Sequence, residues 1–172
     1  ELLGVLAERV LVLDGATGTG IQARDLTAAD FGGAEYEGCN EHLVLTRPDV
    51  VADVHALYLE AGCDIVETNT FGATPLVLAE YGLAQHAREI NRRAAAIARE
   101  QCARFDQPGQ RRFVAGSMGP TTRALSVTGG VTFEALQQLV HVEQLLDQRL
   151  DPVLVERHLL HQPQLRCRRR DA

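Results

Sequence analysis

Four short apolar runs of this sequence each end in side chains that could do chemistry. Asp14, Glu67 and Glu156 are carboxylates that close the runs at residues 10–13, 65–66 and 153–155, and Ser117 follows residues 113–116. Parallel α/β enzymes place their sites at the carboxyl ends of buried strands, so this repetition predicts one polar site made from several strand ends.

The run at residues 65–66 is followed by the most polar of these ends, Glu67, Thr68 and Asn69. One interpretation is that these side chains bind a ligand at the mouth of a buried strand. The alternative is that Thr68 and Asn69 only satisfy backbone groups in a turn. The sequence leaves both interpretations open.

A glycine-rich turn follows the first apolar run. Gly15, Ala16, Gly18 and Gly20 lie within seven residues of Asp14, and so many small residues let a backbone approach a ligand closely. The motif G-x-G-x-x-A at residues 18–23 also allows a dinucleotide-binding site. That alternative needs a second strand soon afterwards, whereas residues 25–40 look like a loop.

Helical spacing separates the four runs. Residues 48–61 predict a helix that ends at Gly62 and is capped by Thr46 and Asp49; residues 75–103 predict helices interrupted at Gly82, and residues 132–145 predict another. With strands at residues 10–13, 65–68, 113–116 and 153–156, the fold class is α/β with parallel strands and flanking helices. The pattern matches the first half of a (β/α)8 TIM-type barrel, whose full length is about 250 residues.

Composition excludes several classes of protein. A net charge of -6 argues against a nucleic-acid partner, and apolar runs far shorter than about 20 residues argue against a membrane segment. The cysteines Cys39, Cys63, Cys102 and Cys167 form no CxxC pair, so neither a disulfide framework nor a zinc knuckle is predicted. A cytoplasmic protein with free thiols is expected.

The chain changes character after Glu156. Residues 157–172 are rich in Arg, His, Gln and Leu and have no clear period, so residues 1–156 are predicted to form one domain and the remainder an atypical basic tail. Either a shifted reading frame or a solvated basic tail would explain the change.

Three ordered motifs, LDGATGT at residues 13–19, EAGCDIVETNTF at 60–71 and VAGSMGP at 114–120, resemble the homocysteine S-methyltransferase family. The stretches GCNE at residues 38–41, LTRP at 45–48 and ALSVTGG at 124–130 are also similar to that family, so the resemblance covers about residues 9–156. It is strongest to the homocysteine-binding domain of the cobalamin-dependent members.

The resemblance implies a methyltransferase in which zinc activates the homocysteine thiol, with cobalamin and methyltetrahydrofolate bound by other modules. It assigns the substrate ammonium to Asp14 and Glu156, and the substrate carboxylate to backbone N–H groups at residues 15–18. Glu67, Thr68, Asn69 and Ser117 complete the expected site.

The family's zinc ligands lie on later strands, and the cysteines of this chain do not match their motifs, so no metal ligand is predicted here. The isolated chain is therefore expected to bind homocysteine weakly at most, to hold no stoichiometric zinc and to transfer no methyl group. A non-catalytic half-barrel is the alternative. Its open sheet edge and uncovered helix faces would favour association.

Overall fold

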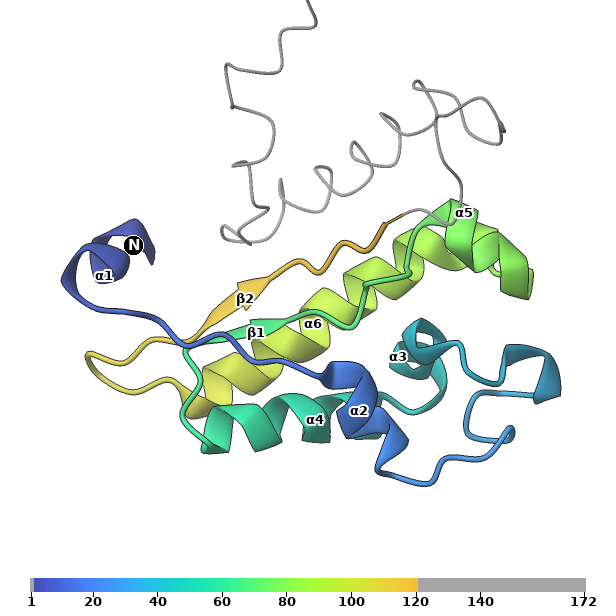
Figure 1. The fold of residues 1–172 in the computed structure, drawn as a ribbon, viewed down its shortest axis with the longest axis horizontal. Coiled ribbons are helices and arrows are strands. Elements are labelled where there is room, and N and C mark those ends of the chain that lie inside the picture. Colours follow the sequence, from blue (N-terminus) through green and yellow to red (C-terminus); the bar gives the residue numbers. More distant parts are fainter. Residues whose placement is uncertain (1, 121–172) are drawn as a thin grey trace, which may run out of the picture.

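The computed structural model describes residues 2–120, in which helices alternate with short parallel strands (Figure 1). The strands are β1 (Ile65–Glu67) and β2 (Phe113–Ala115), and the helices of at least six residues are α1 (Leu2–Glu8), α2 (Thr17–Gln22), α4 (Pro48–Glu60) and α6 (Ala87–Phe105). Shorter helical segments are η1 (Ala34–Tyr36), η2 (Asn40–His42), α3 (Leu43–Thr46), α5 (Pro75–Leu78), η3 (Ala79–Tyr81) and η4 (Ala84–His86).

The predicted parallel arrangement is confirmed for the first three strand positions. β1 pairs in parallel with β2, with Glu67 opposite Ala115, and Leu13 forms a parallel bridge to Ile65 on the other side of β1. The Asp14 N–H donates to the Ile65 carbonyl over 2.9 Å. All three strand positions therefore have their carboxyl ends at one edge, as the sequence predicts.

Each strand is shorter than expected, and the first is reduced to its bridge at Leu13. A side chain replaces part of the ladder there: the Val12 N–H donates to the Asp64 carboxylate over 2.9 Å. The Val12 carbonyl still accepts from the backbone N–H groups of Asp64 and Ile65, over 2.8 and 3.1 Å. Residues 10–13 are thus fastened to β1 without forming a regular strand.

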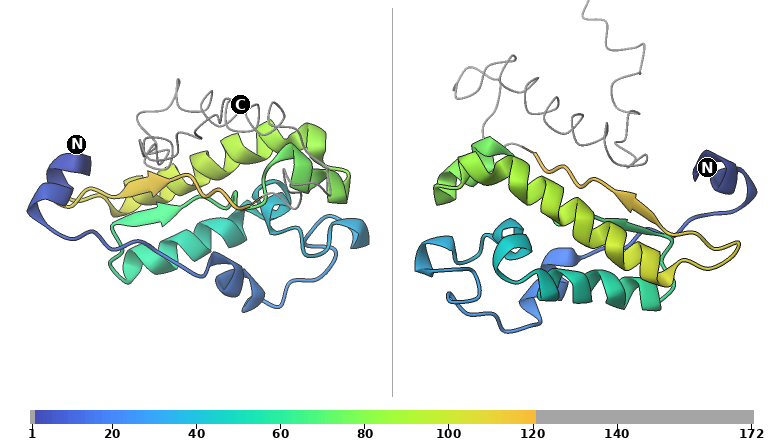
Figure 2. Two further views of the ribbon diagram at one scale, coloured as in Figure 1. Left: turned by 45° about the horizontal axis from the view of Figure 1, so that its top comes forward. Right: turned by 180° about the vertical axis from the view of Figure 1, so that it is seen from behind.

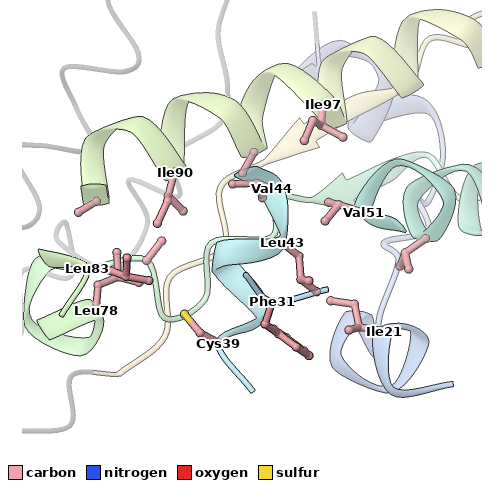
Figure 3. Packing of buried hydrophobic residues seen from close by; sticks show 14 residues of the cluster. Ile21, Phe31, Cys39, Leu43, Val44, Val51, Leu78, Leu83, Ile90 and Ile97 are labelled. Atoms are coloured by element: carbon pink, nitrogen blue, oxygen red, sulfur yellow. The ribbon is translucent and has the colours of Figure 1, made fainter. Parts of the chain in front are cut away.

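The helices α4 and α6 pack against each other and cover one face of the strands (Figure 2). Val66 on β1 is fully buried in a cluster with Leu59 of α4 and with Ala98 and Cys102 of α6. A larger cluster fills the space between α6 and the segments that precede it, as Figure 3 shows for Leu43, Val51, Leu78, Ile90 and Ile97. These two clusters pack the helices against one another and against β1, and so support the carboxyl edge.

The predicted helix boundaries are largely confirmed, but the predicted cap of α4 is wrong. α4 begins with Pro48 in its first turn, and its N-cap position, Arg47, provides no side-chain hydrogen bond. Asp49 instead binds the Arg47 guanidinium over 2.7 Å. The Thr46 hydroxyl turns away and donates to the His42 carbonyl over 3.4 Å. The Asp49 carboxylate, which the predicted capping box needs, is therefore bound to Arg47.

Several predictions fall outside the described residues: the helix at 132–145, the strand at 153–156 with Glu156, the ALSVTGG motif and the basic tail. The division of the chain at residue 156 therefore stays a prediction. Within residues 2–120, none of the helices combines the length and apolar character that crossing a membrane requires.

Candidate functional site

Asp14 lies at the carboxyl edge, directly after the outer strand position at Leu13. Its side chain is buried, with 9% of its surface exposed, although it follows a segment on the outer side of β1. Its Oδ1 atom accepts the Glu67 backbone N–H over 3.0 Å, which fixes the carboxylate against the end of β1. Its Oδ2 atom has no hydrogen-bond partner among the described residues. A buried carboxylate oxygen without a donor costs free energy, and such an atom is a candidate ligand contact.

The environment of Asp14 makes its charged form unfavourable. Burial raises its pKa to about 6, a rise opposed by the Glu67 N–H and increased by the Glu67 charge. Glu67 itself is half-buried and lies opposite Ala115 at the end of the paired region. The two predicted carboxylates, Asp14 and Glu67, are thus brought together.

The hydroxyls next to Glu67 form a closed set of hydrogen bonds. The Ser117 N–H donates to Thr68 Oγ1 over 3.1 Å, and Thr70 Oγ1 donates to the Ser117 carbonyl over 2.8 Å. Because Thr70 has used its proton, Thr68 donates in the 2.7 Å contact between the two hydroxyls. These groups tie β1 to the segment after β2, which supports the structural interpretation of Thr68.

The η2 segment also holds the chain after β1 in place. The Asn69 side-chain amide donates to the Asn40 carbonyl over 2.8 Å, and the Gly72 N–H donates to Glu41 Oε1 over 2.7 Å. The Asn69 amide group is therefore used in positioning its own loop. Sequence reasoning missed Glu41 and Thr70 as site residues. The signals were there, because Glu41 lies in the GCNE motif and Thr70 repeats the hydroxyl of Thr68 two residues later.

The glycine-rich segment after Asp14 is predicted to be a turn, but most of it is helical. Ala16 adopts a left-handed conformation (φ 47°), and the chain then enters α2 at Thr17, so Gly18 belongs to a helix. The first backbone N–H groups of a helix have no partner within it, and they remain available to a ligand. A Cβ atom at Gly15 or at Gly18 would meet no atom within 4 Å, so the space above this turn is open.

The dinucleotide alternative is not supported by the described fold. Although α2 opens with glycines as the motif requires, the next strand among residues 2–120 is β1, which begins at Ile65. The compact strand–helix–strand unit of such sites is absent from this part of the chain.

The described residues do not fit a zinc site. No group of three or more His, Cys, Asp or Glu side chains within residues 2–120 is arranged to hold a metal ion. Cys39, Cys63 and Cys102 are separate, buried thiols, and burial raises their pKa values to about 11, 11 and 12. Zinc binds thiolates, so buried thiols that resist deprotonation are poor ligands.

Comparison with known proteins identifies the family. The model of the family described as "Homocysteine S-methyltransferase" matches residues 11–158. This chain belongs to the homocysteine S-methyltransferase family. The motifs that carry the resemblance, at residues 13–19, 60–71 and 114–120, all lie inside the matched range.

Two curated relatives are the methionine synthases of Mycobacterium tuberculosis and Mycobacterium leprae. Each is 44% identical to this chain over 158 residues, which is 91% of this chain and 13% of the relative. The chain thus spans about an eighth of the length of these relatives.

Two solved structures of the homocysteine methyltransferase MmuM from Escherichia coli share the fold. Its metallated form gives a TM-score of 0.66 at 22% identity, and its oxidized form gives 0.67 at 26% identity. The alignments cover 84% and 87% of this chain but 52% and 54% of those chains. The α/β assignment, with parallel strands and flanking helices, agrees with these neighbours.

Proposed function

We propose that this chain is the homocysteine-binding part of a methionine synthase, an enzyme that transfers a methyl group to the homocysteine thiol to form methionine. Family membership and the 44% identity to methionine synthases support this proposal. The structural observation that carries it is the buried Asp14 carboxylate, whose Oδ2 atom has no donor, at the carboxyl edge of the strands.

The amino-acid end of homocysteine fits the groups at this edge. Asp14 and Glu156 bind the ammonium group, since carboxylates form strong charged hydrogen bonds with N–H donors. Backbone N–H groups at residues 15–18, including those of Gly15, Ala16 and Gly18, bind the substrate carboxylate. Glu67 lies beside Asp14, while Thr68, Asn69 and Ser117 hold this edge in shape.

We propose that residues 1–156 form the first half of a (β/α)8 barrel. The coverage of 52% and 54% of the two MmuM chains supports this division. The zinc ligands, and the modules for cobalamin and methyltetrahydrofolate, then belong to other parts of the enzyme, because residues 2–120 offer no suitable ligand group for the metal. A cytoplasmic location fits the free thiols Cys39, Cys63 and Cys102.

An NMR titration of the 172-residue chain with homocysteine tests this proposal. We expect weak binding, with a dissociation constant on the order of 1 mM, and chemical-shift changes at residues 14–18 and 67–69. Methyl transfer by this chain alone is not expected. Asp14→Asn should abolish the shifts, whereas Asp53→Asn, on the exposed side of α4, should preserve them. Equal binding by wild type and Asp14→Asn would contradict the assigned site.

A further inference from the structure

The carboxyl edge brings two carboxylates together without a cation. Asp14 and Glu67 lie on neighbouring chain segments, joined by the 3.0 Å hydrogen bond from the Glu67 backbone N–H to Asp14 Oδ1. Among the described residues, no side chain donates to Asp14 Oδ2, and no hydrogen bond or ion pair involves the Glu67 carboxylate. Two adjacent negative groups of this kind repel each other, which favours a positive ligand between them.

The buried position of Asp14 separates this pair from an ordinary acidic surface patch. Only 9% of Asp14 is exposed, and its unpartnered oxygen lies at the same strand ends as the half-buried Glu67. The arginines near β1 are at the opposite edge, where Arg9 and Arg112 contact Asp64. Neither arginine contacts Asp14 or Glu67.

The chemistry of the pair favours an ammonium group over a metal ion. A hard divalent cation takes six or more oxygen ligands, and residues 2–120 contain no cluster of three or more metal-binding side chains. An ammonium group has three N–H donors, and it can bridge two separate carboxylates.

Resting on the proposed function, we propose that Glu67 is a further binding residue for the homocysteine ammonium, and that this ammonium displaces a proton held by the Asp14–Glu67 pair. Below about pH 6 the empty site holds this proton on Asp14. When the ammonium arrives, Asp14 gives up that proton to solvent, and the two carboxylates share the positive charge of the ligand. Below about pH 6 each amino acid bound therefore releases up to one proton, whereas at pH 7.5 Asp14 is already ionised and almost none is released.

The surroundings of Asp14 are consistent with this exchange. Burial and the Glu67 charge both raise the pKa of Asp14, which reaches about 6. The other titratable groups that interact with Asp14 are Cys63, just before β1, and Cys102 on α6. Burial raises the pKa values of both thiols to about 11 or above, so they stay neutral when Asp14 titrates.

The test follows the side-chain carboxyl signal of Asp14 by 13C NMR against pH, with and without homocysteine. In the wild type we expect a midpoint of about 6 that homocysteine lowers. Glu67→Gln should lower the midpoint of the empty site and weaken homocysteine binding at pH 7.5 by roughly tenfold, since one charged hydrogen bond is replaced by a neutral one. A purely structural role for Glu67 would weaken the binding of homocysteine and of 4-sulfanylbutanoate, which lacks the ammonium group, to the same extent, whereas loss of an ammonium contact weakens only homocysteine binding.

Two controls sharpen the comparison. Glu60→Gln, an exposed residue at the end of α4, should match the wild type in both measurements. 4-Sulfanylbutanoate, which is homocysteine without its ammonium group, should leave the Asp14 midpoint unlowered. If Glu67→Gln disturbs the fold, Glu67→Asp preserves the charge, and it should maintain a raised midpoint.

The outcomes separate the two proposals. If homocysteine binds the wild type and Glu67→Gln equally and moves both midpoints equally, the role of Glu67 is wrong while the homocysteine site stands. If homocysteine affects neither residues 14–18 nor Asp14 in the wild type, the proposed function fails, and this inference fails with it.

Discussion

His55 shows how one buried side chain links the stability of this fold to pH. The residue lies on α4 and is fully buried, and neither ring nitrogen has a hydrogen-bond partner among the described residues. Burial lowers its pKa from 6.5 to about 4, because the protonated imidazole is poorly solvated there. Below pH 6.5 the unfolded chain therefore takes up a proton more readily than the folded one.

We predict that His55→Leu becomes progressively more stable than the wild type as the pH falls. The contribution of His55 is fully present above pH 6.5 and is lost towards pH 4. Between pH 7.5 and pH 5 the difference in unfolding free energy should grow by about 2 kcal/mol. Urea denaturation at both pH values measures it, with the half-exposed His86→Gln as a control. A constant difference across this range would contradict the assignment.

In the segment after β2, Gly119 lies where a larger residue would collide with the neighbouring loop. A Cβ atom there would lie 2.5 Å from the Phe71 carbonyl oxygen and 2.7 Å from its ring, whereas one at Gly116 would meet nothing within 4 Å. The Gly119 N–H also donates to that Phe71 carbonyl over 2.8 Å. This close approach joins the loop after β1 to the segment after β2.

Gly119→Ala should consequently destabilise the protein by about 1–3 kcal/mol, because a backbone carbonyl cannot move aside as a flexible side chain could. Gly116→Ala is the matched control and should stay within about 0.5 kcal/mol of the wild type. Equal denaturation midpoints for the two variants would show that the Phe71 backbone and ring can shift away from residue 119 at little cost in free energy.

At the level of elements, Asp64 fastens the segment before Asp14 to β1. Its carboxylate accepts two hydrogen bonds from the Arg9 guanidinium, over 2.6 and 2.9 Å, and a third from the Val12 N–H over 2.9 Å. Arg9 holds the pKa of Asp64 below its usual range. Because Asp14 follows two residues after Val12, this anchor at the amino edge also determines where the Asp14 carboxylate lies.

We predict that Asp64→Asn costs about 3 kcal/mol of stability, since it removes the charge that pairs with Arg9 and, within residues 2–120, leaves the buried Arg112 without a counter-ion. Hydrogen exchange of the Val12 amide should accelerate more than that of Val66. Arg9→Gln should have a smaller effect, because the Arg9 side chain is 41% exposed. Unchanged exchange at Val12 in Asp64→Asn would rule out the anchoring role.

These elements also explain what the sequence could and could not predict. The change from apolar to polar residues located the ends of three parallel strand positions correctly, because burial dictates that pattern. The pattern did not predict that the Asp64 carboxylate accepts a hydrogen bond from the Val12 N–H. Nor did it predict that Asp49 forms an ion pair with Arg47 and does not cap α4. Both errors come from charged side chains that compete for backbone or carboxylate partners, and such competition depends on the folded conformation.

The same limit applies to the candidate site. Carboxylates at strand ends predicted that Asp14 and Glu67 would meet, but only the structure shows that one Asp14 oxygen lacks a donor. The hydroxyl pattern of residues 68–70 did not reveal that Thr68 and Thr70 bond to each other and to Ser117. A polar strand end therefore predicts the place of a site better than the role of each side chain in it.

At the scale of the whole molecule, apolar side chains gather at the beginning of the chain. Leu3 and Leu6 of α1, followed by Val10, Val12 and Leu13, are all exposed among the described residues. Residues 10–13 pair with β1 on one side only, so within residues 2–120 their other edge has no partner strand. An apolar, unpaired edge of this kind promotes association between chains.

We therefore predict that the 172-residue chain associates in solution, and that Val12→Lys shifts it towards the monomer. A lysine on an exposed edge opposes strand pairing, and the backbone hydrogen bonds of Val12 do not depend on its side chain. Leu57→Lys is the matched control: both residues are 56% exposed and both changes add one positive charge, but Leu57 lies on the outer side of α4. Light scattering after size-exclusion chromatography measures the effect. A monodisperse wild-type monomer, or equal responses of the two variants, would show that this edge does not drive association.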